Sequence, residues 1–300
     1  MADLNQEIWT DVLVKDFNRT EEASFLGEIP DESRFVSATT GDNEVIHLVD
    51  VGADPEVLIN NTTYPLGITE QTDKDIPILL DKYQTTATSI TIDEMQFIRY
   101  DKIRLVQNKH KDAVMRTKHA KATHALAPQT NTETTPVIET TGDVDSVTGL
   151  KKLRKADILS LKRKFDALKI PLQGRILVLS SDHYNDLLEH ENTFANQISD
   201  EKTGMLNKRL YGFKVYEYVA TPYFNKTTKE KLAFAAVPTS DHTQASVAFY
   251  APDMFRASGS SQNFVDKPST QTQRWMFNVR HNYIVLPKKK RAIGAIVSVA

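Results

Sequence analysis

Apolar and polar residues follow several distinct patterns along the chain, and each pattern predicts a different kind of element. Near the N-terminus apolar side chains recur at spacings of three and four residues, at Ile8, Trp9, Val12, Leu13 and Phe17. This spacing predicts a short helix with one apolar stripe. A helix of this length is marginal in water by itself. We therefore expect it to dock, either on its own domain or on a neighbouring subunit.

Residues 44–91 have a β-type pattern instead. The segments 45–51 and 76–90 are rich in β-branched residues, and both predict strands. The segment between them is polar and contains several glycines, prolines and asparagines. Together they predict a two-stranded ribbon with a large tip. A ribbon has no core of its own, and ordering about 20 tip residues costs on the order of 20 kcal/mol of backbone entropy. The ribbon must therefore stay mobile or lie across another surface.

A long helical pattern follows over residues 93–127, with a change of register near Tyr100 and a stop signal at Pro128. Between residues 102 and 126 the basic side chains greatly outnumber the acidic ones, of which Asp112 is the single example. A helix of this length is typical of a structural strut rather than of a compact enzyme domain. Its basic face is either solvated or directed at packaged nucleic acid or acidic neighbours.

The second half of the chain has an α/β pattern. The Thr-rich stretch 129–149 reads as a linker near a domain boundary. It precedes a helix over 158–168, a continuously apolar strand at 176–179 and a helix capped near Ser180. A strand entered through a glycine follows at 211–219. Further strands are expected at 232–237, 245–250, 270–279 and 293–299.

Composition narrows the class of protein. A length of 300 residues allows about two domains, and 40% apolar residues suffice for a sizeable core. The 37 basic and 39 acidic residues nearly balance, which argues against a protein whose whole surface wraps nucleic acid. Cysteine is absent, which excludes disulfides, thiolate metal sites and a cysteine nucleophile. We find neither a membrane-spanning apolar run nor a signal peptide, and expect a soluble intracellular protein.

No motif for catalysis, cofactor binding or metal binding is found. The sequence contains no phosphate-binding glycine loop and no nucleophile elbow. His119 and His124 are five residues apart, which places them on different faces of a helix, so they do not form a zinc pair. One basic run, formed by Lys288, Lys289, Lys290 and Arg291, joins two apolar segments. It is either a solvated hairpin tip between strands or a sequence-independent contact to packaged DNA.

Residues 155–184 carry local motifs that resemble a known family. A helix is followed by the segment from Pro171 to Arg175, which reads P-x-x-G-R, by an apolar strand, and by the run from Ser181 to Tyr184. The strand at 212–215 reads G-F-x-V. These motifs, together with the order of the elements, resemble the major capsid proteins of tailed bacteriophages, which have the Hong Kong 97-like fold.

The resemblance implies an α+β chain with four parts. Residues 1–43 would form an N-terminal arm, and residues 44–91 the extended β-ribbon, or E-loop, that lies on an adjacent subunit. The peripheral domain, with its long spine helix, would comprise 92–148 and 258–282. The α/β axial domain would comprise 149–257 and 283–300.

The resemblance also implies a function. Such subunits assemble as pentamers and hexamers into an icosahedral head that encloses double-stranded DNA, within the cytoplasm of a bacterial host. The implied partners are other copies of the chain, a separate scaffolding protein, a portal protein and decoration proteins, with no membrane and no cofactor. One alternative is the shell of an encapsulin-like protein compartment. Another, of a different class, is a soluble α/β enzyme or binding protein whose site the sequence does not reveal.

The charges suggest how neighbouring subunits recognise each other. The ribbon is acidic and the following helix is basic, so we expect the ribbon of one subunit to lie against the helix of the next. The candidate inter-subunit residues are Trp9 and Leu13 on the arm, Asp54, Glu56, Glu70 and Asp73 on the ribbon, and Lys109, Lys111 and Arg116 on the helix.

Overall fold

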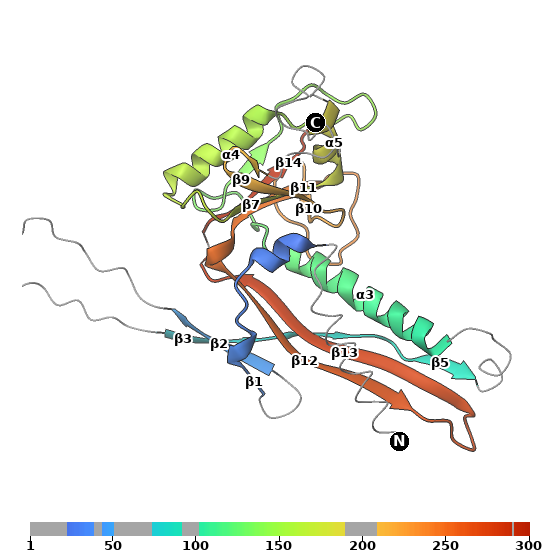
Figure 1. The fold of residues 1–300 in the computed structure, drawn as a ribbon. Coiled ribbons are helices and arrows are strands. Elements are labelled where there is room, and N and C mark those ends of the chain that lie inside the picture. Colours follow the sequence, from blue (N-terminus) through green and yellow to red (C-terminus); the bar gives the residue numbers. More distant parts are fainter. Residues whose placement is uncertain (1–22, 39–43, 51–73, 92–101, 190–208, 290) are drawn as a thin grey trace, which may run out of the picture.

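The computed structural model of the chain is elongated, with an α/β lobe at one end and a long β-hairpin with a helix along it at the other (Figure 1). The structure describes residues 23–38, 44–50, 74–91, 102–189, 209–289 and 291–300. Within these residues no helix is both long and apolar enough to cross a lipid bilayer.

The lobe is built on a mixed sheet with the strand order β6-β14-β11-β7-β9-β8, and β10 pairs with β11. Its pairs β7–β9 and β6–β14 are parallel, whereas β11 is antiparallel to both β7 and β14. The strands are β6 (Val137–Glu139), β7 (Arg175–Leu179), β8 (Arg209–Leu210), β9 (Phe213–Glu217), β10 (Tyr223–Asn225), β11 (His242–Tyr250) and β14 (Ile293–Val297).

Both faces of this sheet are covered, which explains why β7 is apolar at nearly every position. Leu177 and Leu179 face the helices α4 (Lys155–Ala167) and α5 (Ser181–Glu189). Ile176 and Val178 point to the other face, because successive side chains of a strand alternate. That second face is covered by the 3-10 helix η1 (Ser24–Glu28) and by the C-terminal end of α3 (Lys102–Ala125). The lobe is therefore a three-layer sandwich.

The elongated part is a second sheet, in which the long strands β12 (Met254–Asp266) and β13 (Arg274–Pro287) form a hairpin. Two shorter strands, β4 (Asp81–Gln84) and β5 (Thr88–Thr91), pair with β13 on its other side. Helix α3 runs along this sheet (Figure 1). Val114 of the helix packs against Val279 of β13 in a small apolar cluster, so the helix and the hairpin stiffen each other.

A third, three-stranded sheet holds the root of the ribbon. It comprises β1 (Val36–Ala38), β2 (Glu44–Asp50) and β3 (Lys74–Leu79) in that order. Ile46 of β2 packs with Phe255 of β12 and Ile284 of β13. The Glu44 carboxylate accepts hydrogen bonds from the backbone N–H of Ser260 at 2.9 Å. A side chain at Gly259 would meet that carboxylate, which would then have to move.

Four expectations from the sequence need correction. The strand predicted over 76–90 is divided into β3, β4 and β5, and the last two pair with β13. The linker 129–149 contains a short strand, β6. Residues 232–237 form an exposed turn instead of a strand, because Ala235 has a positive φ of 64°, which extended backbone does not allow. The run 288–291 is not a hairpin tip, since β13 and β14 belong to different sheets.

The long helix and the α/β elements agree with the sequence patterns. Helix α3 ends at Ala125, just before the predicted stop at Pro128. The strand expected at 211–219 is β9, and a turn with positive φ at Tyr211 and Gly212 leads into it. The predicted beginning of the long helix, at 93–101, and the helix at the N-terminus lie outside the described residues.

Candidate assembly surfaces

The exposed side of α3 carries a positive surface. Lys109 and Arg116 are exposed, and Lys111 is half-buried. Two other basic residues of the segment 102–126 do not contribute to this surface. Lys118 is buried, and Lys121 forms an ion pair with Asp81 of β4 at 2.7 Å. The cationic surface is therefore smaller than the sequence suggested, and it consists of the part of α3 that lies farther from the lobe.

Buried basic groups gather where α3 crosses the β-hairpin. The Nζ of Lys118 lies 4.5 Å from the centroid of the Tyr283 ring. Burial, together with the nearby Arg256, lowers the pKa of Lys118 to about 7. Burial and the charge of Lys118 lower the pKa of His119 to about 4 and that of His281 to about 3. At neutral pH both histidines are therefore uncharged, which a position inside the protein requires.

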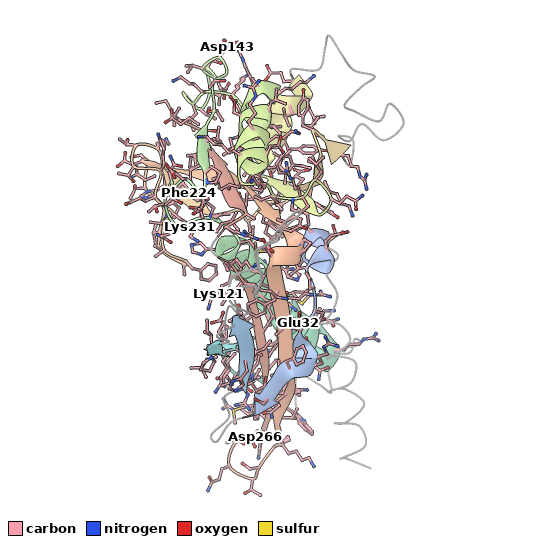
Figure 2. The ribbon with its side chains drawn as sticks, turned by 90° about the vertical axis from the view of Figure 1, so that its left-hand side faces the viewer. Glu32, Lys121, Asp143, Phe224, Lys231 and Asp266 are labelled. Carbon is pink, nitrogen blue, oxygen red and sulfur yellow. The ribbon has the colours of Figure 1, made fainter. Side chains whose placement is uncertain are left out.

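The C-terminal end of α3 is held by the lobe. The Nζ of Lys231 donates hydrogen bonds to the carbonyl oxygens of His124 and Ala127, both at 2.8 Å. A lysine at this place satisfies two free carbonyls of the helix end and complements the helix dipole. Figure 2 shows Lys231 between Phe224 of the lobe and Lys121 of α3. The strut and the lobe are thus joined by directed contacts as well as by apolar packing.

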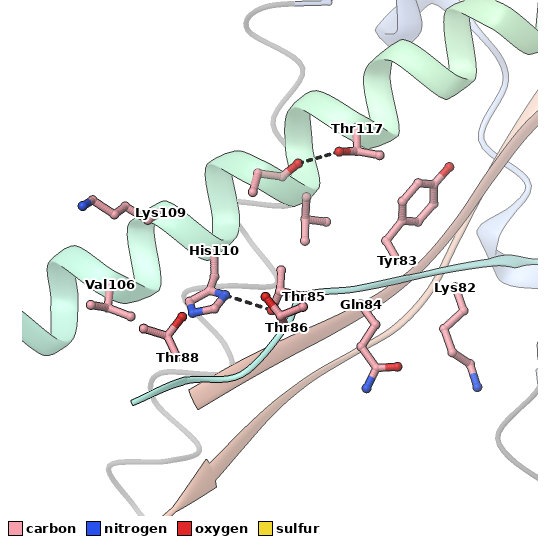
Figure 3. Close-up of a pocket in the computed structure, with 12 residues that line it drawn as sticks. Lys82, Tyr83, Gln84, Thr85, Thr86, Thr88, Val106, Lys109, His110 and Thr117 are labelled. Atoms are coloured by element: carbon pink, nitrogen blue, oxygen red, sulfur yellow. Dashed lines mark hydrogen bonds between the residues drawn. The ribbon is translucent and has the colours of Figure 1, made fainter. Parts of the chain in front are cut away.

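A groove of about 620 Å³ lies between α3 and the chain segment 82–88 (Figure 3). Lys82 and Lys109 line it together with several threonines. His110 contacts the hydroxyl of Thr85 at 2.8 Å, and burial lowers the pKa of this histidine. The lining residues include no carboxylate.

Some of the acidic ribbon residues that the structure describes already have partners within their own subunit. Glu44 binds the backbone of Ser260, and Asp81 pairs with Lys121. The candidate residues Asp54, Glu56, Glu70 and Asp73 on the ribbon, and Trp9 and Leu13 on the arm, lie outside the described residues. Of the candidates on α3, Lys109 and Arg116 share one face of the helix, whereas Lys111 lies on a different face. Their acidic counterparts remain predictions.

The basic run at 288–291 connects the two large sheets. Lys288 forms an ion pair with Glu32 at 2.9 Å, and Arg291 lies 3.6 Å from Asp253. Lys289 is exposed, and Lys290 lies outside the described residues. Two members of the run thus have acidic partners in their own subunit, which reduces the positive charge that they present to solvent.

Sequence reasoning missed the exposed apolar residues of the lobe. Val219 and Val237 are 71% and 85% exposed, and Leu172 is 58% exposed. The sequence offered one signal, the apolar run 232–237, which was interpreted as a strand. Across the described part of the chain, no cluster of His, Asp and Glu side chains could hold a metal ion.

Comparison with known proteins agrees with this picture of a structural subunit. A family model described as "Phage capsid protein" matches residues 73–297. No curated protein matches the sequence.

Solved structures show the same fold at low sequence identity. The capsid of an empty GTA particle has a TM-score of 0.63 at 12% identity, covering 93% of this chain and 90% of that one. The capsid of Ralstonia phage GP4 has a TM-score of 0.62 at 8% identity, with coverages of 94% and 91%. A virus-like particle from Pyrococcus furiosus has a TM-score of 0.53 at 11% identity, with coverages of 97% and 99%.

Proposed function

Because this chain belongs to the phage capsid protein family, we propose that its copies assemble into the pentamers and hexamers of an icosahedral head that encloses double-stranded DNA. The chain is a structural component of the virion capsid, with an α+β fold that matches Hong Kong 97-like capsids, and is not an enzyme. The observation that supports this proposal most strongly is the family match, together with an architecture of a long helix, a long hairpin and the paired strands β2 and β3 at the root of the ribbon (Figure 1).

The parts of the fold acquire specific roles in this proposal. The β2–β3 ribbon is the root of the E-loop, α3 is the spine helix, and the β12–β13 sheet is the body of the peripheral domain. The lobe is the axial domain. Since β6 pairs with β14 in the sheet of the lobe, we assign residues 137–139 to the axial domain as well, and residues 81–91 to the peripheral sheet.

The other proposed partners follow from the family. A scaffolding protein, a portal protein and decoration proteins would act during or after assembly in the cytoplasm of a bacterial host. Packaged DNA would meet exposed basic side chains such as Lys289 by weak, salt-sensitive and sequence-independent contacts.

A protein compartment that holds cargo enzymes is the second candidate function. The observation in its favour is the similarity to the virus-like particle from Pyrococcus furiosus, which covers nearly all of both chains. The contents of particles isolated from the native host distinguish the two functions: nuclease-protected DNA of uniform length supports a phage head, and a co-purified enzyme without DNA supports a compartment.

Electron microscopy of the purified protein, expressed alone and with neighbouring head genes, tests the assembly itself. We expect uniform closed particles in at least one of these preparations, because the chain belongs to the phage capsid protein family. The measurement is the particle diameter distribution together with the sedimentation coefficient. A monomer that persists at every concentration and with every co-expressed head protein would contradict the proposal.

The positive surface of α3 is the proposed docking site for the acidic ribbon of a neighbouring subunit. Lys109 and Arg116 are exposed there, and Lys109 also borders the groove in Figure 3. The ribbon beyond β2 and β3 contains Asp54, Glu56 and Asp73. Opposite charges on the two surfaces would accelerate association and select the register of the contact.

Reversing the charge of Lys109, Lys111 and Arg116 to glutamate is therefore expected to reduce particle yield severalfold at low salt. The defect should shrink as salt rises, because repulsion between exposed charges is screened. The measurement is the assembled fraction by sedimentation between low and high ionic strength. The matched control reverses Arg163, Lys164 and Lys267, which are exposed on other elements. Equal yields for the two triple variants would refute the α3 contact.

A further inference from the structure

We propose that the lobe carries, at opposite ends of its parallel strands β7 and β9, the two halves of a head-to-tail contact between neighbouring copies of this chain. The first half is the patch of Val219, Phe234 and Val237, called here the carboxyl-end patch. The second half is formed by Leu172 and Tyr211 and is called the amino-end patch. This inference rests on the proposed assembly into rings and specifies which surfaces meet within a ring.

The carboxyl-end patch surrounds an apolar groove. Val219 follows β9, and Phe234 lies in the exposed turn between β10 and β11. Both line a groove of about 360 Å³, whose other walls include Pro222, Tyr223 and Leu232. The adjacent Val237 has 85% of its surface exposed. Aliphatic and aromatic side chains grouped around a hollow are the features of an interaction site rather than of an ordinary monomer surface.

The amino-end patch consists of two exposed residues in the loops before β7 and β9. Leu172 lies in the loop before β7 and is 58% exposed, and Tyr211, before β9, is 39% exposed. The two loops are adjacent, because a Cβ added at Gly212, the residue after Tyr211, would lie 3.8 Å from the Cδ2 of Leu172. The positive φ values of Tyr211 and Gly212 hold this turn in a defined shape. An exposed leucine and an exposed tyrosine have the chemistry that an apolar groove accepts.

The two patches are different surfaces of one subunit. Strands β7 and β9 are parallel, with Ile176 opposite Lys214 and Leu179 opposite Glu217. Leu172 and Tyr211 precede these strands, whereas Val219 follows them, so the patches are separated by about the length of a five-residue strand, roughly 16 Å. Two different surfaces on one subunit are what a closed ring with cyclic symmetry requires.

The charges that flank the patches are complementary. Glu217 is exposed and lies two residues before Val219 of the carboxyl-end patch. Lys169 and Arg209 are exposed beside the amino-end patch. Opposite charges at the rim of an apolar contact favour the head-to-tail pairing and disfavour the pairing of two like ends. Charge and apolar character thus favour the same occupant for the groove, the amino-end patch of a second copy.

Crosslinking in assembled particles tests the contact, and the absence of cysteine from the chain makes the test specific. The double variant Leu172→Cys/Phe234→Cys is assembled and treated with a short bismaleimide. We expect a denaturing gel to show a ladder of linked subunits that ends at the pentamer and hexamer. The matched control is Val147→Cys/Phe234→Cys, since Val147 is 90% exposed but lies outside both patches. Each single variant should give no ladder.

A charge exchange decides the question independently of the introduced cysteines. Glu217→Lys is expected to lower the assembled fraction severalfold at low salt, and adding Arg209→Glu in the same chain should restore it. The control Glu133→Lys changes an exposed charge that belongs to neither patch and should leave assembly unchanged.

The outcomes separate this inference from the proposed function. Particles without a ladder, a ladder of equal strength in the Val147 control, or failure of Arg209→Glu to restore assembly would each overturn the contact while the capsid role stands. Failure of the unmodified chain to form particles under any condition would instead defeat the proposed function.

Discussion

Acidification from pH 7 to pH 5 is expected to lower the free energy of unfolding of the isolated subunit by several kcal/mol. The cause is a set of three buried histidines. His119 and His183 have pKa values lowered to about 4, and His281 has a pKa lowered to about 3, in each case mainly by burial. As the pH falls, their imidazoles accept a proton at a higher pH in the unfolded chain than in the folded one.

The sign follows from proton linkage. Below the ordinary histidine pKa of about 6.5 the unfolded chain binds protons that the folded protein excludes, so the unfolded state is favoured as the pH falls. Each histidine with a folded pKa of about 4 contributes a loss of about 2 kcal/mol between pH 7 and pH 5. Lys118 has a pKa lowered to about 7. It therefore also lowers the free energy of unfolding as the pH falls, but it does so mainly above pH 7, between its folded pKa and the ordinary lysine pKa of about 10.4. Asp186, whose pKa is raised by burial, acts in the opposite direction.

Denaturant unfolding of the monomeric subunit at several pH values measures this effect. His183 is the most informative single position, because its two ring nitrogens contact the hydroxyls of Ser246 and Ser298 at 2.6 and 2.7 Å. His183→Gln should make the pH dependence shallower. Leu187→Ala in the same helix should lower stability by a similar amount at every pH, since it removes no titrating group. An unchanged pH slope in the His183 variant would contradict the assignment.

Replacing Phe25 by alanine is expected to lower the free energy of unfolding by about 3–5 kcal/mol. Phe25 is the main apolar anchor of η1 on the lobe. Its ring centroid lies 5.7 Å from that of Tyr218, 6.1 Å from that of Tyr216 and 6.3 Å from that of Phe249. Because the site is enclosed by these rings and by the sheet, truncation leaves a cavity as well as removing buried apolar area.

A second phenylalanine in the same N-terminal segment provides the control. Phe35 is 52% exposed, and substitution of an exposed side chain away from special features changes stability by about 0.5 kcal/mol or less. Chemical denaturation of Phe25→Ala, Phe35→Ala and the unmodified subunit compares the three directly. Similar losses in both variants would show that η1 is not held by the aromatic cluster.

Local patterns predicted the lobe well because the burial of its elements repeats within a few residues. The apolar strand at 176–179 and the helical face from Ile158 to Leu168 have the periodicity of a covered strand and an amphipathic helix, and both are present as β7 and α4. The same reasoning failed at 232–237. An apolar run is compatible with either a strand or an exposed binding turn, and only the surroundings distinguish them.

The candidate assembly site was predictable in outline but not in extent. The excess of lysine and arginine between residues 102 and 126 indicated a positive helix, and Lys109 and Arg116 are exposed on α3. The sequence did not reveal that Lys118 faces the hairpin and is 2% exposed. The side of a helix that is buried depends on what packs against it, and β13 lies more than 150 residues away in the chain.

The sequence by itself determined the order and type of most elements and the segregation of charge, because helix and strand periodicity and the list of ionisable residues are local properties. The tertiary structure decided which strands share a sheet, as in the pairing of Thr85 with Val279 through the backbone at 3.0 Å. It also decided which basic and apolar residues reach the surface. Both depend on contacts between distant segments, whose free energy appears only after the chain has closed those long loops.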